Sequence, residues 1–201
     1  LGKLSLTADW YHKITDGILL RLNTSQLTGL NPPYQNAAEV KNVGWELGIN
    51  YNDKWGDFDF GIGFNISDVK NEITDMKGQS SGTLLRHQEG YPVNSIYGYM
   101  ADGLYQSQEE IDAGPVQFGT LQPGDIKYKD IAGAFDDNGN PIGDGKITDE
   151  DKTIIGSTIP RYTYGLNLDF GWKGFKLNAF FQGVGKVDGY LNSHYVIPCV
   201  N

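Results

Sequence analysis

The stretch RYTYGLNLDFGWKGFKLNAFFQ, residues 161–182, contains two alternating runs joined by a tight turn. In the first run, every second residue from Tyr162 to Trp172 is apolar or aromatic, and polar or small residues occupy most of the positions between them. The second run, residues 175–181, continues the pattern after the turn WKGF. Alternation with period two is typical of a strand with one apolar and one polar face, so the stretch predicts an antiparallel hairpin.

The same alternation recurs at residues 3–10, 45–52 and 57–66. Short turns, NDKWGD near 52–57 and WKG at 172–174, alternate with long connections such as residues 69–95. Aromatic residues lie near several predicted strand ends, namely Trp45, Trp55, Trp172, Tyr51 and Tyr162. Unequal turns and aromatic strand ends are typical of an outer-membrane barrel. We therefore expect an all-β fold of antiparallel up-and-down strands from a large transmembrane β-barrel with long extracellular loops, although a soluble sandwich shows the same alternation.

Composition excludes several classes of protein. The chain has 201 residues and a formal charge of −9, which argues against nucleic acid as a partner because phosphate binding needs clustered Lys and Arg. A run of about 18 apolar residues, which a spanning helix requires, does not occur. Cys199 is the only cysteine, so an intrachain disulfide is excluded. LGKLSLTADW reads as a strand already in progress, and we expect both ends to be cuts in a longer chain.

The stretch 102–122 interrupts the strand pattern. SQEEIDA predicts one helical turn with Ser107 as N-cap and Glu110 at the capping-box position. Aromatic residues in the long connections can stack on sugar rings or fill small cores within the loops; these are Tyr91, Tyr97, Tyr99, Tyr105 and Phe118.

GDGKITDEDKTIIG, residues 143–156, resembles the second half of a calcium loop. EF-hand-type loops place oxygen ligands at positions 1, 3, 5, 7, 9 and 12, with glycine at position 6. Counting Asp144 as position 5 puts Gly145 at position 6, and the remaining ligands are then the Lys146 carbonyl, Thr148 and Asp151. Position 3 would be Ile142, whose side chain cannot bind a cation.

An insertion explains the mismatch. Asp130 then opens the loop, AGAFDDNGNPI is extra, and Asp144 resumes the loop. Asp136, Asp137 or Asn138 would fill the vacant position. The predicted metal ligands are therefore Asp130, Asp144, Lys146, Thr148 and Asp151, with calcium in a structural role. The alternative is a solvated acidic turn in which DDNGN is a hairpin tip.

Catalysis is not expected. His12, His87 and His194 are far apart, without the spacing of metal ligands or of a catalytic triad. Asp57 and Asp59 share one strand face, where an ordinary polar face is the better interpretation than a catalytic pair.

Several of these motifs together resemble a known family. PGDIKYKDI, followed by DGKITDEDKTIIGSTIPRYTYGLNLDFGWKGFKLNAFFQGVGK, resembles the late barrel region of the SusC/RagA family, TonB-dependent outer-membrane transporters of Bacteroidetes. LTADWYHKITDGILL and NAAEVKNVGWELGINY resemble the preceding strands. The resemblance covers nearly the whole chain in the right order, and the insertion at 132–143 departs from the usual form.

The resemblance implies that residues 1–201 are part of a barrel of 22 strands, without its N-terminal plug and including the calcium-type loop at 130–151. It also implies location in the outer membrane of a Gram-negative bacterium, contact with lipid, a SusD-like lipoprotein partner and coupling to TonB through regions absent here. The expected function is nutrient uptake, with import of oligosaccharides or peptides, including polysaccharide utilisation. The alternative is a secreted or surface β-module, stabilised by calcium, that binds glycans.

Overall fold

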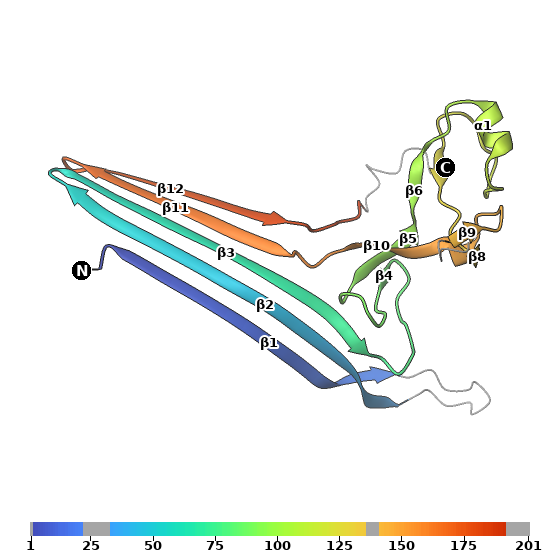
Figure 1. The fold of residues 1–201 in the computed structure, drawn as a ribbon, viewed down its shortest axis with the longest axis horizontal. Helices are drawn as coiled ribbons and strands as arrows, with labels where there is room; N and C mark the ends of the chain where they lie inside the picture. The colour runs from blue at the N-terminus through green and yellow to red at the C-terminus, as the bar shows by residue number, and fades with distance from the viewer. Residues whose placement is uncertain (1, 22–32, 136–140, 192–201) are drawn as a thin grey trace. The chain divides into compact units, whose positions relative to one another are not determined.

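The computed structural model describes residues 2–21, 33–135 and 141–191. The chain divides into two compact units, each with its own packing. We call Leu1–Ser95 with Gly156–Asn201 the sheet unit, and Ile96–Ile155 the loop unit. Figure 1 shows the long strands of the former and the short elements of the latter.

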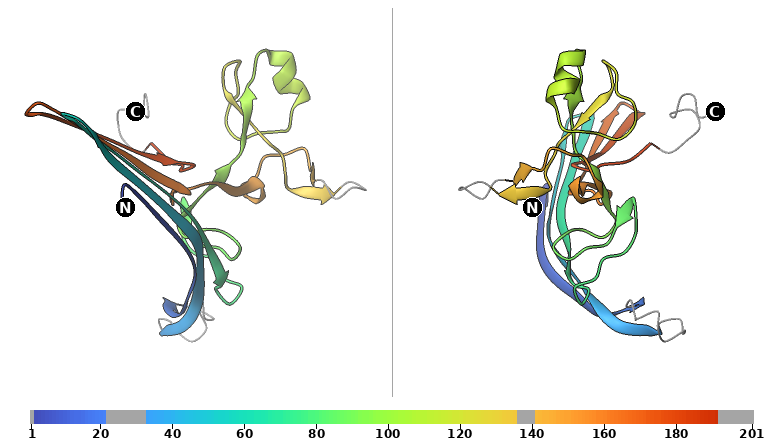
Figure 2. Two further views of the ribbon diagram at one scale, coloured as in Figure 1. Left: turned by 60° about the vertical axis from the view of Figure 1, so that its left-hand side comes forward. Right: turned by 90° about the vertical axis from the view of Figure 1, so that its right-hand side faces the viewer.

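The sheet unit is built on one antiparallel five-stranded sheet in the order β1-β2-β3-β11-β12. Its strands are β1 (Leu4–Arg21), β2 (Tyr34–Trp55), β3 (Phe58–Asp75), β11 (Tyr162–Trp172) and β12 (Phe175–Gly185). The sheet is bent along its strands (Figure 2). Antiparallel neighbours confirm the all-β, up-and-down prediction. These five strands do not close into a barrel (Figure 1).

The predicted hairpin at 161–182 is present. β11 and β12 pair without interruption from Tyr162↔Gly185 to Trp172↔Phe175. The two residues between them, Lys173 and Gly174, have φ values of 44° and 90°. Positive φ at both central residues is the geometry that two-residue hairpins favour, because its twist matches that of the strands.

The strands exceed their predicted lengths. β2 contains 22 residues and β3 contains 18, where alternation predicted strands over 45–52 and 57–66. The turn predicted across NDKWGD is shorter, because β2 continues to Trp55 and β3 begins at Phe58. Gly56, with φ of 61°, provides the reversal.

The sheet has one apolar and one polar face. Register aligns Leu6, Ile49, Phe64, Leu166 and Phe181 in one row across all five strands. Leu6 is 65% exposed and Phe181 is 58% exposed, so this face is not packed against a second layer in the described part of the chain.

The next row lies on the opposite face. It aligns Thr7, Gly48, Asn65, Gly165 and Gln182. Its residues are polar or lack a side chain. Glycine and carboxamide residues alternate between neighbouring strands, so each carboxamide residue of the row has a glycine as its register partner. The Asn65 Oδ1 atom, for example, would be 2.6 Å from a β-carbon placed on Gly165.

Buried apolar packing occurs beyond the central part of the sheet. Ala38, Ile73 and Met76 form the cluster of buried residues in the sheet unit, where β2 and β3 extend towards the connection that follows β3. Ile18, Leu20, Val40 and Val93 pack against it. The long connection also carries the two-residue strand β4 (Leu85–Arg86).

The loop unit consists of short elements. They are β5 (Ser95–Tyr99), β6 (Ala101–Leu104), α1 (Gln108–Ala113), β7 (Ile126–Tyr128), β8 (Gly133–Phe135), β9 (Pro141–Gly143), the 3-10 helix η2 (Asp149–Asp151) and β10 (Lys152–Ser157). β5 pairs with β10, β6 with β7 and β8 with β9. Ile96, Tyr105 and Ile147 are its buried apolar residues among those described. No helix in the described ranges has the length and apolar character needed to span a membrane.

The helical turn predicted at SQEEIDA is α1. Ser107 is its N-cap, and the Ser107 hydroxyl accepts a hydrogen bond from the Glu110 amide. The Glu110 carboxylate accepts instead from the Gln106 amide, at 2.8 Å, and forms an ion pair with Lys127 at 2.9 Å. The cap is thus as predicted, whereas the Glu110 carboxylate pairs one residue outside the capping-box position.

Candidate functional site

Asp130 closes the loop across the insertion. Its Oδ1 atom accepts a hydrogen bond from the Asp144 amide at 3.2 Å, and its Oδ2 atom accepts from the Gly145 amide at 2.7 Å. The inserted residues between these partners include the antiparallel pair β8 and β9. Residues 136–140, which contain the predicted hairpin tip and the candidates for the vacant ligand position, lie outside the described residues.

Gly143 makes room for the Asp130 carboxylate. A β-carbon at this position would lie 2.0 Å from the carboxyl carbon and 2.2–2.3 Å from its two oxygens. These distances are far below van der Waals contact, so any side chain at 143 would displace the carboxylate from the Asp144 and Gly145 amides.

Asp151 holds the other end of the loop. Its side chain is fully buried, and its Oδ1 atom accepts from the Ile131 and Ala132 amides at 2.8 Å each. Its Oδ2 atom accepts from the Thr148 amide at 2.6 Å. Burial alone would raise the pKa of this carboxyl, but the three backbone amides stabilise the charged form and hold the pKa below its ordinary value.

The other predicted ligands take part in the same network. The Lys146 amide donates to Asp144 Oδ1 at 2.9 Å, and Thr148 caps η2 through a hydrogen bond from the Glu150 amide to its hydroxyl. Within the described ranges, no group of three or more His, Cys, Asp or Glu side chains is placed to hold a metal ion. The carboxylates serve here as acceptors for backbone amides. Calcium binding therefore stays a prediction.

The aromatic residues of the long connections have different roles. Tyr105 is only 1% exposed and belongs to the core of the loop unit. Phe118 is 54% exposed and packs against Tyr99 and Tyr128, with ring centroids 5.4 and 5.8 Å away. The Tyr99 and Tyr128 centroids are 5.2 Å apart. We call Tyr99, Phe118 and Tyr128 the aromatic cluster. Sequence reasoning missed Tyr128, whose proximity follows from the pairing of β6 with β7.

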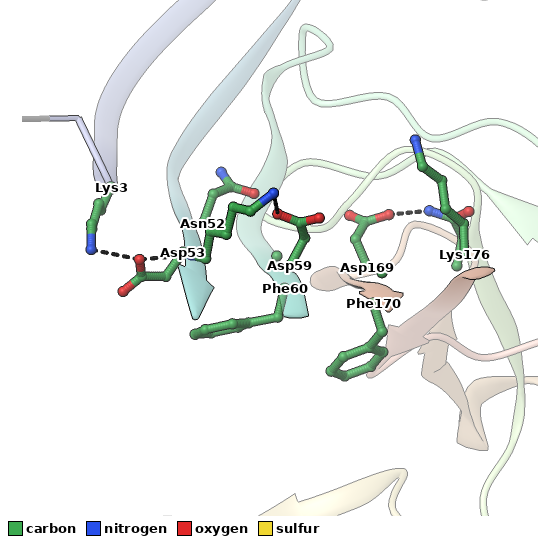
Figure 3. A pocket seen from close by; sticks show the side chains of 12 residues that line it. Lys3, Asn52, Asp53, Asp59, Phe60, Asp169, Phe170 and Lys176 are labelled. Atoms are coloured by element: carbon green, nitrogen blue, oxygen red, sulfur yellow. Dashed lines mark hydrogen bonds and ion pairs between the residues drawn. The ribbon is translucent and has the colours of Figure 1, made fainter. Parts of the chain in front are cut away.

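A shallow hollow lies near the turns of the sheet unit (Figure 3). Charged and polar side chains line it in pairs: Lys3 with Asp53, Lys54 with Asp59, and Asp169 with Asn178. Gly61 and Gly171 also line it, and a β-carbon on Gly61 would lie 2.6 Å from Asn52 Oδ1. The Asp59 and Asp169 carboxylates each have a partner already, and this arrangement fits a hydrated polar surface better than acid–base chemistry.

Arg161, just before β11, forms a bidentate ion pair with Asp68 of β3. Its Nε and Nη2 atoms donate to the two oxygens of Asp68, both at 2.7 Å. Backbone bonds from the Val69 amide to the Arg161 carbonyl and from the Arg161 amide to the Lys186 carbonyl extend the pairing beyond β11. The sequence did not reveal this pair, since partners so far apart in sequence show no local signal.

Comparisons with known proteins point to one class. No family model matches the chain. It is 29% identical to TonB-dependent receptor P3 of Formosa agariphila over 90% of the chain, and 28% identical to TonB-dependent receptor P26 of the same organism over 96%. These alignments cover 18% and 20% of those proteins. The chain thus spans about a fifth of the length of the curated relatives it matches.

Solved structures show the same fold. The chain superimposes on the RagAB peptide importer in its open-open state with a TM-score of 0.71, and in its closed-closed state with 0.68. The identities are 22% and 23%, and each match covers 92% of this chain and 19% of the other. The fold is therefore that of a sheet from a TonB-dependent transporter barrel. The resemblance predicted from the motifs is confirmed: over most of its length the chain is similar to SusC/RagA-like TonB-dependent receptors.

Proposed function

We propose that the chain forms part of the transmembrane barrel of a TonB-dependent transporter in the outer membrane of a Gram-negative bacterium. The observation that carries this proposal is the continuous apolar face of the five-stranded sheet, which is exposed to a large extent. Lipid would cover such a face in a barrel, so its side chains need no second protein layer.

Two rows of aromatic residues bound the apolar face. We call Trp10, Trp45 and Tyr162 the first aromatic row; register aligns them across β1, β2 and β11, with Asp68 of β3 between the last two. The second aromatic row is continuous across β2, β3, β11 and β12 and consists of Trp55, Phe58, Trp172 and Phe175. All four Trp residues of the chain lie in these rows.

The spacing of the rows matches a bilayer. Trp45 and Trp55 are ten positions apart on β2, as are Tyr162 and Trp172 on β11. Ten residues at about 3.3 Å each extend about 33 Å along a strand. A strand tilted by about 35–45° would then cross about 23–27 Å, close to the apolar band of about 25 Å in outer-membrane barrels. The rows fit the two aromatic girdles of such a protein.

The polar face would line the lumen. Its alternating glycine and carboxamide residues form a smooth, uncharged wall near the middle of the sheet, such as Asn50 beside Gly63 and Asn65 beside Gly165. The loop unit would lie outside the membrane, with the 130–151 loop held by carboxylate–amide hydrogen bonds and with calcium as the predicted additional brace. Loops of this kind would help to shape the entrance to the lumen.

The proposed substrate and partner rest on the proteins that the chain resembles. The two structures are named as peptide importers, and the resemblance also implies oligosaccharides. We propose import of one of these classes, with a SusD-like lipoprotein as partner and energy coupling through TonB. The relatives are named as receptors and importers rather than as enzymes.

The alternative is the soluble β-module that binds glycans. It requires the apolar strand faces to pack against each other, whereas Leu6 and Phe181 on that face are more than half exposed. Among the described residues, the buried apolar clusters are small compared with the exposed apolar face of the sheet. The transporter is therefore the better proposal.

Circular dichroism and tryptophan emission test the proposal. We expect the purified 201-residue chain to give strand signal and blue-shifted emission only with detergent micelles, because all four Trp residues lie in the aromatic rows. Brominated detergent should quench that emission. A cooperative β fold in plain buffer, with blue-shifted emission that brominated detergent does not quench, would favour the soluble module.

A further inference from the structure

Phe180 is an aromatic residue on the polar face of the sheet. It is the register partner of Asn167 of β11, which in turn pairs with Gly63 of β3. It is 63% exposed. The sequence did not distinguish it from Phe181, which follows it and belongs to the apolar face. A large apolar ring thus lies in a face that is otherwise mostly polar or glycine, and its neighbours determine what it can bind.

Glycine backbone lies beside the Phe180 ring. A β-carbon on Gly165 would lie 3.6 Å from Phe180 Cε2 and 2.6 Å from Asn65 Oδ1. A β-carbon on Gly63 would lie 3.5 Å from the Asn167 β-carbon. The ring and the two asparagine side chains therefore border a strip of bare backbone. We call Phe180, Asn65, Asn167, Gly63 and Gly165 the wall site.

The carboxamides of the wall site have unused hydrogen-bonding capacity. Within the described part of the chain, the side chains of Asn65 and Asn167 form no hydrogen bond. Each carboxamide offers two N–H donors and one carbonyl acceptor. Charged side chains nearer the turns differ in this respect, since Lys54, for example, is paired with Asp59 at 3.2 Å. The wall site can therefore both donate to a ligand and accept from it.

The two rows that carry the wall site are uncharged. Register aligns them as Ser5, Asn50, Gly63, Asn167 and Phe180, next to Thr7, Gly48, Asn65, Gly165 and Gln182. Charged residues of the polar face begin in the adjacent rows, with Lys3 and Asp169 towards the turns and Asp9 and Glu46 away from them. A charged ligand would find no counter-ion within the wall site, so a neutral ligand fits it better.

An uncharged sugar ring matches these features. A pyranose presents C–H groups on its faces, which the negative face of an aromatic ring attracts, and its hydroxyls both donate and accept hydrogen bonds. A hollow that Asn65 and Gly48 help to line adjoins the site, and ligand sites are usually concave. A peptide with free ends brings two charges into rows that hold none. The wall site therefore fits a neutral sugar better than a peptide.

We propose that the wall site is a contact for neutral oligosaccharides on the wall of the lumen. Phe180 stacks on one sugar ring, and the Asn65 and Asn167 carboxamides bind its hydroxyls. The site belongs to the sheet unit and not to the loop unit, so it acts on substrate that has already passed the entrance. This inference rests on the proposed function and narrows its two substrate classes to oligosaccharides.

Isothermal titration calorimetry tests this inference on the full-length polypeptide in detergent. The sugar probes are maltohexaose, cellohexaose and laminarihexaose, and a tryptic digest of casein supplies peptides. We expect at least one of the three sugars to bind, and Phe180→Ala to raise its Kd about fivefold because the stacking ring is lost. The matched control is Phe181→Ala, which truncates the adjacent exposed ring on the apolar face and should leave Kd unchanged.

Two further substitutions separate stacking from simple apolar contact. Phe180→Trp keeps an aromatic ring and should retain sugar binding. Phe180→Leu keeps an apolar side chain without a ring, and should weaken sugar binding as much as Phe180→Ala does. An apolar contact with the N-terminal plug would need no ring, and Phe180→Leu would then bind sugar as the wild type does.

The outcomes separate this inference from the proposed function. If peptides of the digest bind and none of the three sugars does, peptide import stands and the wall site is overturned. If neither class binds, the proposed substrates fail as well. If a sugar binds but Phe180→Ala matches Phe181→Ala, oligosaccharide import stands and the wall site is overturned. Full sugar binding by Phe180→Leu would also overturn it.

Discussion

At residue 143, a hydrogen atom in place of a side chain decides how the loop closes. The Asp130 carboxylate occupies the space that a β-carbon of Gly143 would fill, and from there it reaches the Asp144 and Gly145 amides. The loop is thus held by a carboxylate at each end, Asp130 at one and Asp151 at the other. Each makes bonds that bridge more than ten residues of chain.

We expect Gly143→Ala to destabilise the loop, because the added methyl group would push the Asp130 carboxylate away from two amides. Leaving them without that acceptor costs about 0.5–1.5 kcal/mol for each lost hydrogen bond. Amide hydrogen exchange at Gly145 measures the effect. Gly189→Ala is the control, because no atom lies within 4 Å of a β-carbon there. Equal exchange in both variants would contradict the contact.

Asp151 makes the loop sensitive to acid. Its pKa is lowered in the folded state, so its contribution to stability is fully present above the ordinary value of 3.8 and is lost as pH falls through the lower folded value. Asp151→Asn should weaken the loop at pH 7 and remove this contribution to the acid dependence. Hydrogen exchange at Ala132 in both proteins between pH 2.5 and 7, corrected for the intrinsic exchange rate, would reveal it. Identical corrected profiles would count against the buried carboxylate.

Sequence reasoning identified these acidic residues but not their contacts. Their spacing suggested a cation loop, since the same oxygens that bind calcium also accept backbone amides. The choice between the two depends on where the inserted residues go. The spacing of Asp130 and Asp144 in the sequence does not reveal the path of the inserted residues. The pairing of β8 with β9 shows that part of the insertion forms a hairpin.

Among the elements, the β11–β12 hairpin depends on its turn. Gly174 has φ of 90°, and a β-carbon there would meet no atom within 4 Å. Gly174→Ala should therefore cost about 1–2 kcal/mol through backbone strain alone. Lys173→Asn should stabilise the turn, because Asn tolerates positive φ better than Lys. Urea unfolding in micelles measures the change in unfolding free energy for both variants. Stabilisation by Gly174→Ala together with destabilisation by Lys173→Asn would show that the turn has another geometry.

The loop at 130–151 yields a separate prediction about calcium. If hydrogen bonds hold it, the amides of Gly145 and Ala132 stay protected from hydrogen exchange when EGTA removes the cation. We expect this result, because both amides already have carboxylate acceptors at 2.7–2.8 Å. Protection that disappears in EGTA and returns with calcium would show that a cation is the principal brace.

The strands were predictable only where their two faces differ. Residues 45–52 alternate clearly, but β2 begins at Tyr34, and Val40, Lys41, Asn42 and Val43 show no alternation. There the strand lies beyond the first aromatic row, and Lys41 pairs with Glu72 of β3 at 3.2 Å. Val40 packs against the buried cluster of Ala38, Ile73 and Met76, so the two faces no longer differ as they do in the middle of the sheet, and the period of two disappears although the strand continues. Strands of the loop unit such as β7 and β8 have only three residues, too few to show a period.

At the scale of the molecule, each unit has its own chemistry. The sheet unit is nearly neutral and exposes an apolar face, whereas the loop unit is acidic and compact around Tyr105 and Ile147. Under the proposed function, the first unit would face lipid on one side and water on the other, and the second would lie in water. Both are expected of a barrel segment and its extracellular loop.

Cysteine accessibility tests most directly which sheet face meets lipid. In the full-length polypeptide in native outer membranes, with Cys199→Ser as background, Ile49→Cys and Phe64→Cys probe the apolar face. Asn50→Cys and Asn65→Cys probe the polar face one residue away on the same strands. We predict that a water-soluble maleimide modifies only the second pair, whereas a membrane-soluble maleimide modifies the first. Modification of positions 49 and 64 by the water-soluble reagent, with positions 50 and 65 protected, would contradict lipid contact on the apolar face.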